Sequence, residues 1–327
     1  MFYQKQMDIL FVKLGAMGDV VNSLPLAVTL KIHLGARIHW LVEPLSLPLV
    51  SGHPSVDSVI LFDKNRLPLS VPKIIIQLSK GYWDISLDLQ RTAKSSLMCM
   101  ISRSTRRIGF DRQRCKEMTW IMPFERIPKS DPSAHMVYQY LEFAKHLGVP
   151  DNDIRWEIPV TGIPSHALPR EYLVLNIGAT KPANRWTAEG FSSLVRECVQ
   201  RYGIPCVLTG GREDVQFSHE IETMAGQEVI NLTGKTSLLE LKEVLAGSHA
   251  VISCDTGPMH LAVALGKKVI ALFGPADPRR TGPFVGEVIR KDLHCSPCNR
   301  RVCDDPVCMK SITASDVLEK LNAVLAK

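Results

Sequence analysis

The stretch His249–Gly274, HAVISCDTGPMHLAVALGKKVIALFG, decides the fold of the second half of the chain. Its apolar run at 250–253 predicts a buried strand, which ends at the loop DTGP (255–258). A helix is expected over 259–265, and a second apolar strand over 269–273. This order of strand, helix and strand is typical of a parallel α/β sheet.

The DTGP loop has the composition of a helix N-terminus. Pro258 suits the first helical turn, where a missing N–H costs nothing, and Asp255 or Thr256 suits the N-cap. The free N–H groups of such a tip attract anions, and open α/β sheets bind ligands at this edge. An ordinary strand–helix–strand unit, with the loop as cap and turn, explains the local pattern equally well.

Composition indicates a globular protein of about two domains. The 327 residues are 45% hydrophobic and 22% charged, and the net charge of +6 suits an anionic partner without identifying it. The opening MFYQKQMD does not resemble a secretory signal, and no apolar run reaches the roughly 18 residues that span a bilayer. We therefore expect a cytoplasmic protein.

The remaining pattern predicts two α/β halves. The first half opens with a strand at 8–14, a glycine-bearing turn at 15–19 and a helix at 20–34. A proline-bearing stretch at 150–169 is the best linker, and a second strand–helix series starts at Tyr172. The sequence thus predicts doubly wound, Rossmann-like domains over residues 1–160 and 161–327, with a ligand-binding cleft between them.

Polar residues follow three further predicted strands. The turn Gly15-Ala-Met-Gly18-Asp19 lacks the G-x-G-x-x-G spacing of dinucleotide-binding turns, and Asp19 suits either a helix cap or proton transfer. The loop 176–186 offers a hydroxyl and two cations, as a diphosphate requires, although its end also suits a helix start. The acids of GGRED (210–214) suit a cap or the hydroxyls of a ribose. Together with the DTGP loop, the loops 176–186 and 210–214 give three such strand ends in the second half of the chain, which are stronger together than any one alone.

These segments resemble glycosyltransferase family 9, the ADP-heptose:lipopolysaccharide heptosyltransferases. The resemblance runs through nearly the whole chain and is most specific in the DTG-x-x-H segment. Its first half, with GAMGD and WDISLDLQRTAKSSL, is closer to heptosyltransferase I than to II. The matching segments are KLGAMGDVVNSLP (13–25), NRW (184–186), GGRED (210–214), SCDTGPMHLAVALGKKVIALFGPADP (253–278) and CSPCNRRVCDDPVCMKSIT (295–313).

The resemblance implies a GT-B architecture with the acceptor site mainly in the first domain and the nucleotide-sugar site mainly in the second. It implies an inverting transfer of heptose from ADP-heptose to a Kdo-lipid A type acceptor, with no metal or other cofactor in the chemistry and no nucleic-acid partner. Asp19, after Gly18, matches the family's catalytic aspartate, which acts as general base on the acceptor hydroxyl. A peripheral position on the inner face of the inner membrane follows from the acceptor.

The resemblance also assigns the donor contacts. In the family, residues at these positions hold the pyrophosphate, the donor sugar, the ribose and the adenine. The positions here are Thr180, Thr256, Gly257 and His260 for pyrophosphate and sugar, Asp255 for sugar, Asp214 or Glu213 for ribose, and Thr236 and Leu238 for adenine.

One position departs from the family pattern. Family members often have Lys before Arg/His-Trp, whereas this chain has Asn184. The phosphate cation is then Arg185 or Lys181, and we favour Arg185.

A run of basic residues in the first half is either a solvated face or a surface for an anionic acceptor or membrane. Its members are Arg103, Arg106, Arg107, Arg112, Arg114 and Lys116.

A cysteine-rich segment, 294–309, precedes a closing helix expected at 313–325. Four of the nine cysteines fall within fourteen residues, a density that favours a metal site over disulfides in a cytoplasmic chain. The spacing is not that of a standard zinc finger, so structural zinc, an iron–sulfur cluster and free thiols stay open. His294 is a substitute ligand, and the four thiols are Cys295, Cys298, Cys303 and Cys308.

Three other functions compete with heptose transfer. A family 9 transferase with another sugar nucleotide or acceptor shares every motif. A nucleotide-binding relative without turnover shares the scaffold, although intact Asp19 and DTG-x-x-H argue against it. An NAD-dependent oxidoreductase is disfavoured because the chain lacks a G-x-G-x-x-G turn.

Overall fold

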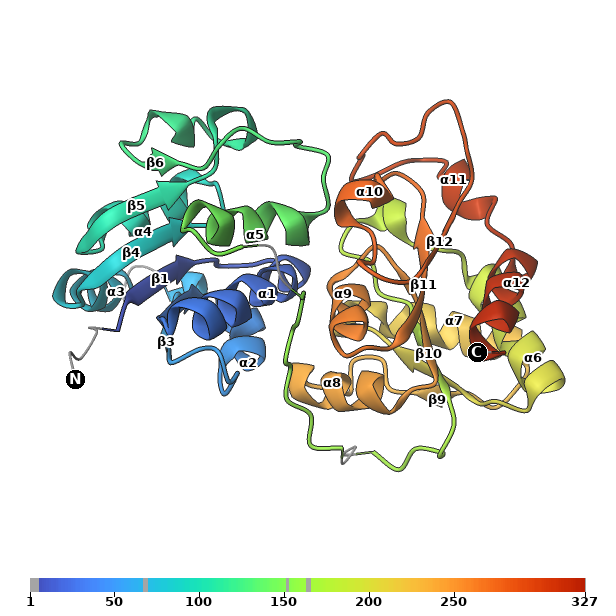
Figure 1. Cartoon of the computed structure of the whole chain (residues 1–327). Coiled ribbons are helices and arrows are strands. Elements are labelled where there is room, and N and C mark those ends of the chain that lie inside the picture. The colour runs from blue at the N-terminus through green and yellow to red at the C-terminus, as the bar shows by residue number, and fades with distance from the viewer. Residues whose placement is uncertain (1–5, 67–69, 151–152, 163–165, 327) are drawn as a thin grey trace. The chain divides into compact units, whose positions relative to one another are not determined.

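A computed structural model of the chain describes residues 6–66, 70–150, 153–162 and 166–326 (Figure 1). Two compact units divide the chain at residues 159 and 160, one residue from the boundary expected from the sequence. Each unit contains one six-stranded sheet, and every strand pair within both sheets is parallel. The predicted α/β class with doubly wound parallel sheets is therefore confirmed.

The N-terminal unit has the strand order β3-β2-β1-β4-β5-β6. Its strands are β1 (Asp8–Val12), β2 (Arg37–Val42), β3 (Ser58–Leu61), β4 (Trp83–Asp88), β5 (Ser104–Gly109) and β6 (Glu125–Arg126). Its α-helices are α1 (Met17–Leu34), α2 (Leu47–Val50), α3 (Ser70–Lys80), α4 (Ala93–Ile101) and α5 (Met136–His146). Single 3₁₀ turns follow β2 (η1, Pro44–Ser46), β3 (η2, Lys64–Arg66) and β5 (η3, Arg112–Arg114; η4, Thr119–Ile121).

Two apolar layers enclose this sheet. Alternate residues of β1 point to opposite faces, so Phe11 packs with α1 and α5, whereas Leu10 packs with α3 and α4. All five residues of β1 are buried, as expected for the central strand of a parallel sheet. The sheet therefore holds its carboxyl edge, where β1 runs into α1, in a fixed position.

The C-terminal unit has the strand order β12-β11-β10-β7-β8-β9. Its strands are β7 (Leu173–Asn176), β8 (Cys206–Thr209), β9 (Ile230–Asn231), β10 (Ala250–Cys254), β11 (Lys268–Phe273) and β12 (Glu287–Arg290). Its α-helices are α6 (Ala188–Tyr202), α7 (Val215–Ala225), α8 (Leu238–Gly247), α9 (Gly257–Ala264), α10 (Pro278–Thr281), α11 (Val307–Lys310) and α12 (Ala314–Leu325). The 3₁₀ turns η5 (Pro182–Asn184) and η6 (Arg212–Asp214) follow β7 and β8.

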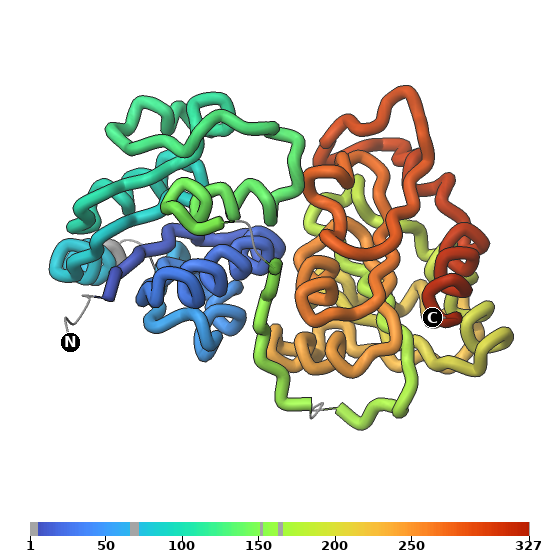
Figure 2. Tube along the Cα trace, in the orientation of Figure 1, coloured from blue at the N-terminus to red at the C-terminus, as the bar shows by residue number. Residues whose placement is uncertain are grey.

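The central strands β10 and β7 carry the loops that hold the predicted donor residues. β10 is buried along its whole length and leads through Asp255 and Thr256 into α9. The closing helix α12 starts at a Thr313 capping box and packs on α6. Figure 2 shows the cysteine-rich chain between β12 and α11 as an extended loop at one end of this unit. Within the described ranges, no helix combines the length and the apolar character needed to cross a bilayer.

Candidate active site

The predicted catalytic carboxylate, Asp19, lies in the first turn of α1. One of its oxygens, Oδ2, lies 3.2 Å from Nζ of Lys13, and the other accepts a hydrogen bond of 3.4 Å from the Tyr140 hydroxyl. The N-cap of α1 is Ala16, so the alternative that Asp19 caps this helix is wrong. The Asp19 side chain is 38% exposed and that of Lys13 is 2% exposed. The Asp19 carboxylate is therefore bound on one side by the buried Lys13 and is open to solvent on the other.

Lys13 occupies an unusual position for a lysine. Burial lowers the pKa of its ammonium group, while the charge of Asp19 opposes that shift. Its Nζ donates to the Leu89 carbonyl at 3.4 Å and lies 5.2 Å from the centre of the Tyr140 ring. A buried charge is retained at such cost only when partners satisfy it, and Asp19 is the nearest carboxylate.

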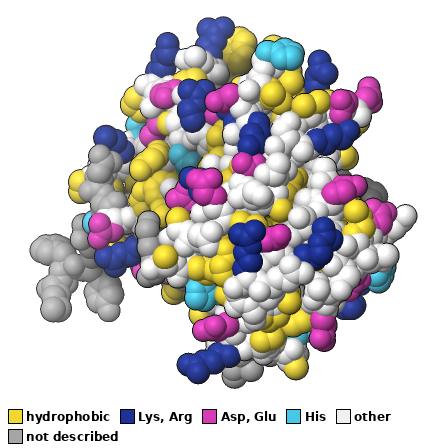
Figure 3. Space-filling view, turned by 90° about the vertical axis from the view of Figure 1, so that its right-hand side faces the viewer, with side chains coloured by type: hydrophobic (Ala, Val, Ile, Leu, Met, Phe, Trp, Pro, Cys, Tyr) yellow, Lys and Arg dark blue, Asp and Glu magenta, His cyan; other side chains and the backbone are white. Residues whose placement is uncertain are grey.

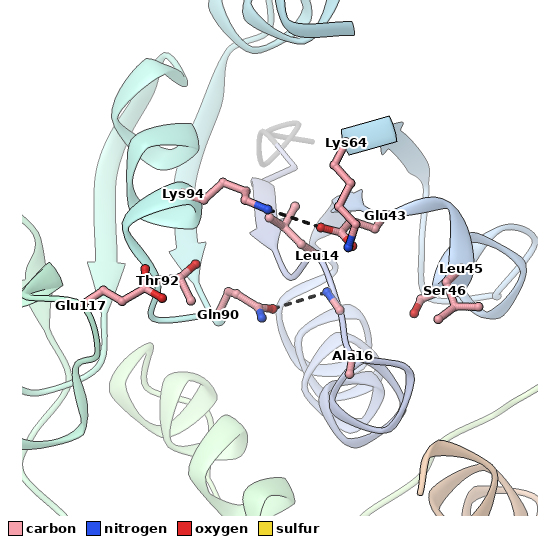
Figure 4. A pocket seen from close by; sticks show the side chains of 11 residues that line it. Leu14, Ala16, Glu43, Leu45, Ser46, Lys64, Gln90, Thr92, Lys94 and Glu117 are labelled. Carbon is pink, nitrogen blue, oxygen red and sulfur yellow. Dashed lines mark hydrogen bonds and ion pairs between the residues drawn. The ribbon is translucent and has the colours of Figure 1, made fainter. Parts of the chain in front are cut away.

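A pocket of about 420 Å³ opens beside the start of α1, at the carboxyl edge of the sheet (Figure 4). Glu43, directly after β2, accepts from Lys64 Nζ at 2.8 Å and lies 3.6 Å from Lys94 Nζ. Gln90, after β4, accepts from the Gly15 N–H at 3.4 Å. The lining residues are Leu14, Gly15, Ala16, Glu43, Leu45, Ser46, Lys64, Gln90, Thr92, Lys94 and Glu117.

The sequence interpretation missed the polar residues of this pocket. Glu43 directly follows β2 and Gln90 lies two residues after β4, so the strand-end argument used for the second half applies to them as well. No local sequence pattern marks Lys64 and Lys94 as pocket residues, because exposed lysines are common in turns and helices of any protein.

The basic run of the first half does not form one solvated face. Arg114 is buried between Asp111 and Glu142, and Arg107 donates to the carbonyls of Cys99 and Ser102. Arg106 pairs with Glu125 through two hydrogen bonds of 2.7 and 2.9 Å. The other three residues of the run, Arg103, Arg112 and Lys116, are exposed.

In the C-terminal unit, buried polar contacts join the ends of β7 and β10. The Asn176 amide donates to Ser253 Oγ at 3.0 Å and to Thr256 Oγ1 at 2.9 Å. Thr256 is the N-cap residue of α9, yet its hydroxyl takes part in these contacts and makes no capping hydrogen bond to the helix N–H groups. The tip at Thr256 and Gly257 is therefore fixed by the neighbouring strand, with His260 buried one turn further along.

Asp255 is the most perturbed of the predicted donor residues. Burial raises the pKa of its carboxyl group to about 6, against the opposing effects of Lys181 and of a hydrogen bond from Asn184. Asn184 Nδ2 donates to Asp255 Oδ2 at 3.2 Å. The residue that replaces the family's lysine is thus a direct partner of Asp255.

Arg185 and Asp214 form an ion pair. Asp214 is buried, and its other oxygen accepts from the Gly211 N–H at 2.8 Å. Burial raises the pKa of Asp214, and the bond from Gly211 and the charge of Arg185 oppose this. A Cβ on Gly178 would lie 2.8 Å from Asp214 Oδ2, so only glycine fits there. Arg185 and Asp214 are thus engaged with each other, whereas Glu213 is exposed.

The predicted adenine residues lie beside the GGRED loop. The Gly234 N–H donates to the Gly210 carbonyl at 3.0 Å, which brings the turn before α8 to the turn after β8. Thr236 and Leu238 are half-buried in this region, and Thr180 is exposed in the loop after β7. The structure thus groups Glu213 with Thr236 and Leu238 through adjacent loops of one sheet edge.

The cysteine-rich segment packs against the end of β11 without forming a metal centre. Cys295 and Cys298 are exposed, Cys303 is half-buried and Cys308 is buried, all as free thiols. A Cβ on Gly274 would lie 2.8 Å from Cys308 Sγ, so glycine permits this close packing. Among the described residues, no three His, Cys, Asp or Glu side chains are grouped to hold a metal ion. As placed, these thiols do not fit zinc, and the zinc hypothesis stays a prediction.

The family model of glycosyltransferase family 9 (heptosyltransferase) matches residues 71–307 of the chain. The chain belongs to this family. Its relatives include the lipopolysaccharide core heptosyltransferase OpsX of Haemophilus influenzae, 24% identical over 87% of this chain and 84% of that protein. Lipopolysaccharide heptosyltransferase 1 of Escherichia coli K12 is 27% identical over 97% of this family 9 chain and 100% of the relative.

Solved heptosyltransferases share the fold of this family 9 chain. The E. coli heptosyltransferase WaaC with ADP aligns with a TM-score of 0.81 and 25% identity, covering 97% of this chain and 100% of that one. E. coli ADP-heptose heptosyltransferase II aligns with a TM-score of 0.78 and 22% identity, covering 98% and 99%. The predicted GT-B fold class is confirmed by these alignments.

Proposed function

We propose that this family 9 chain transfers heptose from ADP-heptose to the inner core of lipopolysaccharide, with inversion at the anomeric carbon. Asp19 removes the proton from an acceptor hydroxyl, and the hydroxyl oxygen attacks the anomeric carbon of the donor heptose. The bond between that carbon and the ADP oxygen breaks in the same step. The observation that carries the proposal is the Asp19 carboxylate, held by Lys13 and open to solvent at a ligand-binding sheet edge of a family 9 fold.

The C-terminal unit is proposed to bind the donor. The N–H groups of Thr256 and Gly257 at the start of α9 suit the diphosphate, which gains charge as ADP leaves. Lys181 is the better candidate for the phosphate cation, because Arg185 is already paired with Asp214. By the same reasoning Glu213 is the better ribose acid, since both oxygens of Asp214 have partners.

Asp255 is proposed to bind sugar hydroxyls. A carboxylate beside a diphosphate suffers repulsion, which favours contact with neutral hydroxyl groups instead. His260, Thr180, Thr236 and Leu238 complete the predicted donor contacts.

The pocket of Figure 4 is proposed to bind an acceptor of the Kdo-lipid A type. Such an acceptor carries carboxylates and phosphates, and Lys64 and Lys94 line the pocket, both beside Glu43. An anionic sugar would replace Glu43 as the partner of one or both lysines. Because this acceptor is lipid-anchored, the enzyme is proposed to work in the cytoplasm at the inner face of the inner membrane.

A transfer assay tests the proposal. Purified protein is incubated with ADP-heptose and Kdo-lipid A, and the product is read by mass spectrometry as a mass increase of one heptose unit. UDP- and GDP-sugars in place of ADP-heptose test the alternative donors. ADP binding without any transfer, unchanged in Asp19→Ala, would instead favour the non-catalytic relative.

A further inference from the structure

The side of the N-terminal sheet that α3 and α4 cover carries an unusual number of exposed apolar residues. We call this surface the α3–α4 face. It includes both helices and the connection after β5, and its exposed apolar side chains are Ile75, Ile76, Leu97, Met100, Met118, Trp120 and Ile121. The most exposed of these are Met118 at 63% and Ile121 at 58%. Scattered single apolar residues are normal on a surface, but this many on neighbouring elements of one layer are not.

The elements of the α3–α4 face share one core. Ile74 of α3, Met98 of α4 and Phe124 after the β5 connection belong to the same buried cluster. The Ala93 N–H at the start of α4 donates to Glu117 Oε2 at 2.9 Å, which ties the connection to that helix. The exposed residues therefore lie above a common layer on one side of the sheet.

Cations surround these apolar side chains and acids are nearly absent. Exposed cations on or next to these elements are Lys73 and Lys80 of α3, Arg103 between α4 and β5, and Arg112 and Lys116 after β5. Among described residues 72–124, the exposed acid is Glu117. Asp84 is half-buried and accepts from the Asp8 N–H at 2.8 Å, and Asp88 and Asp111 are buried in hydrogen bonds to neighbouring side chains. By contrast, the face of the molecule that Figure 3 draws carries cationic and anionic side chains side by side.

Trp120 and Arg112 combine both properties at one point. The Arg112 guanidinium lies 4.2 Å from the centre of the Trp120 ring, and that ring is 41% exposed. Tryptophan beside arginine suits the boundary between lipid headgroups and hydrocarbon, where one end of a side chain is wet and the other apolar.

We propose that the α3–α4 face docks on the surface of a bilayer that contains anionic lipids. The apolar side chains enter the headgroup region and the cations pair with lipid phosphates. The proposal rests on the proposed function, because a lipid-anchored acceptor gives the enzyme a reason to bind the bilayer. A second copy of the chain fits this face poorly, since a symmetric dimer would set cations against cations.

Vesicle co-sedimentation of the full chain tests the proposal. The probes are vesicles of phosphatidylcholine alone and vesicles that also contain phosphatidylglycerol. We expect binding to the anionic vesicles only, and weaker binding at high salt. Trp120→Ser combined with Ile121→Ser should lower the affinity about tenfold or more. Lys73→Gln combined with Arg103→Gln should lower it roughly fivefold per charge.

Val285→Ser with Val302→Ser is the matched control, because both valines are exposed apolar residues of the C-terminal unit. This control should bind vesicles as the wild type does. Equal loss in the control, or no difference between the two vesicle types, overturns the proposal. So does a dimer that Trp120→Ser with Ile121→Ser converts to a monomer, because the face would then bind a second copy.

Transfer to a lipid-free acceptor separates this proposal from the proposed function. The Trp120 and Ile121 variant should retain transfer to a Kdo oligosaccharide in solution and lose it with vesicle-bound Kdo-lipid A. Transfer in solution without vesicle binding overturns the docking face alone. Vesicle binding by the wild type without any transfer overturns the proposed function and leaves the docking face supported.

Discussion

Nζ of the buried Lys13 lies 3.2 Å from Oδ2 of the half-exposed Asp19. Lys13 belongs to the segment that leaves β1, and Asp19 to the first turn of α1, so the glycine turn between them folds the chain back on itself. A cation at this distance favours the ionised form of a carboxylate. Since a general base must be ionised to accept a proton, Lys13 is well placed to keep Asp19 competent and correctly oriented.

Lys13→Met should therefore move the pH dependence of transfer. The acidic limb of the kcat profile is expected to shift to higher pH, because the carboxylate loses its cationic neighbour. The other charged groups near Lys13, Asp88 and Arg91, remain in place. Methionine has a similar length, and the remaining partner, Asp19, is 38% exposed, so the substitution leaves no uncompensated carboxylate buried.

Lys31→Met is the control for this variant, because Lys31 is a more exposed lysine of α1 that pairs with Asp57. It should leave the profile unchanged. If Lys13→Met scales kcat equally at every pH, Lys13 has only a structural role.

Asp19→Asn should remove the base without removing the donor site. We expect kcat to fall by about 10²–10⁴-fold, the usual contribution of general base catalysis, with ADP affinity unchanged in calorimetry. Asp153→Asn is a matched control, because Asp153 is a largely exposed acid of the same unit. Near-normal turnover in Asp19→Asn would exclude Asp19 as the base.

The sequence predicted the strands named above well, because a buried strand depends on a local apolar run. The helix starts were less exact: α1 begins at Met17 and α9 at Gly257, against 20 and 259 expected. The run DILFV predicts a buried strand by composition alone, and the DTGP loop ends β10 where the structure ends it. The Arg185–Asp214 pair was not predictable in this way. These residues lie 29 positions apart and meet only because β7 and β8 are neighbours in the sheet.

The alternative N-cap role of Asp19 is wrong for a related reason. Acid residues at the cap and at the third helical position look alike in sequence, and only the backbone assigns the cap to Ala16. The preference for Arg185 as phosphate cation depended on the family motif, which could not show that Asp214 already binds it.

Lys94→Ala and Lys64→Ala should each weaken acceptor binding. The KM for the acceptor is expected to rise about tenfold, since each variant loses a charge-assisted contact, while kcat and the KM for ADP-heptose stay close to normal. Steady-state kinetics with a lipid-free acceptor measure this split, and Lys129→Ala is the control from an exposed part of the same unit. A raised donor KM with an unchanged acceptor KM would move the acceptor away from this pocket.

Metal removal should leave transfer intact, because the proposed chemistry uses a carboxylate, cations and N–H groups. Rates with and without EDTA should agree. The zinc hypothesis makes a separate prediction, namely one zinc per chain by elemental analysis and a lower metal content in Cys295→Ser with Cys298→Ser. If the purified protein contains no metal and has normal thermal stability, the zinc hypothesis is contradicted and the four cysteines are free thiols.

Asp255→Asn should stabilise the C-terminal unit at neutral pH while weakening donor binding. Burial raises the folded-state pKa of Asp255 to about 6 from 3.8, so the folded protein favours the protonated form. Its cost to folding is absent below about pH 4, grows as pH rises, and reaches roughly 3 kcal/mol above pH 6. A neutral amide avoids that cost and can still accept the hydrogen bond from Asn184.

The free energy of unfolding at pH 7.5 should thus rise in Asp255→Asn by up to about 3 kcal/mol, and by almost nothing at pH 4. Urea unfolding at the two pH values measures this difference. The KM for ADP-heptose should rise in the same variant, because an amide is a weaker acceptor for sugar hydroxyls than a carboxylate. Equal stabilisation at both pH values would show that the effect is one of packing. A destabilised variant at pH 7.5 would show that the ionised carboxylate stabilises the folded state, which contradicts this prediction.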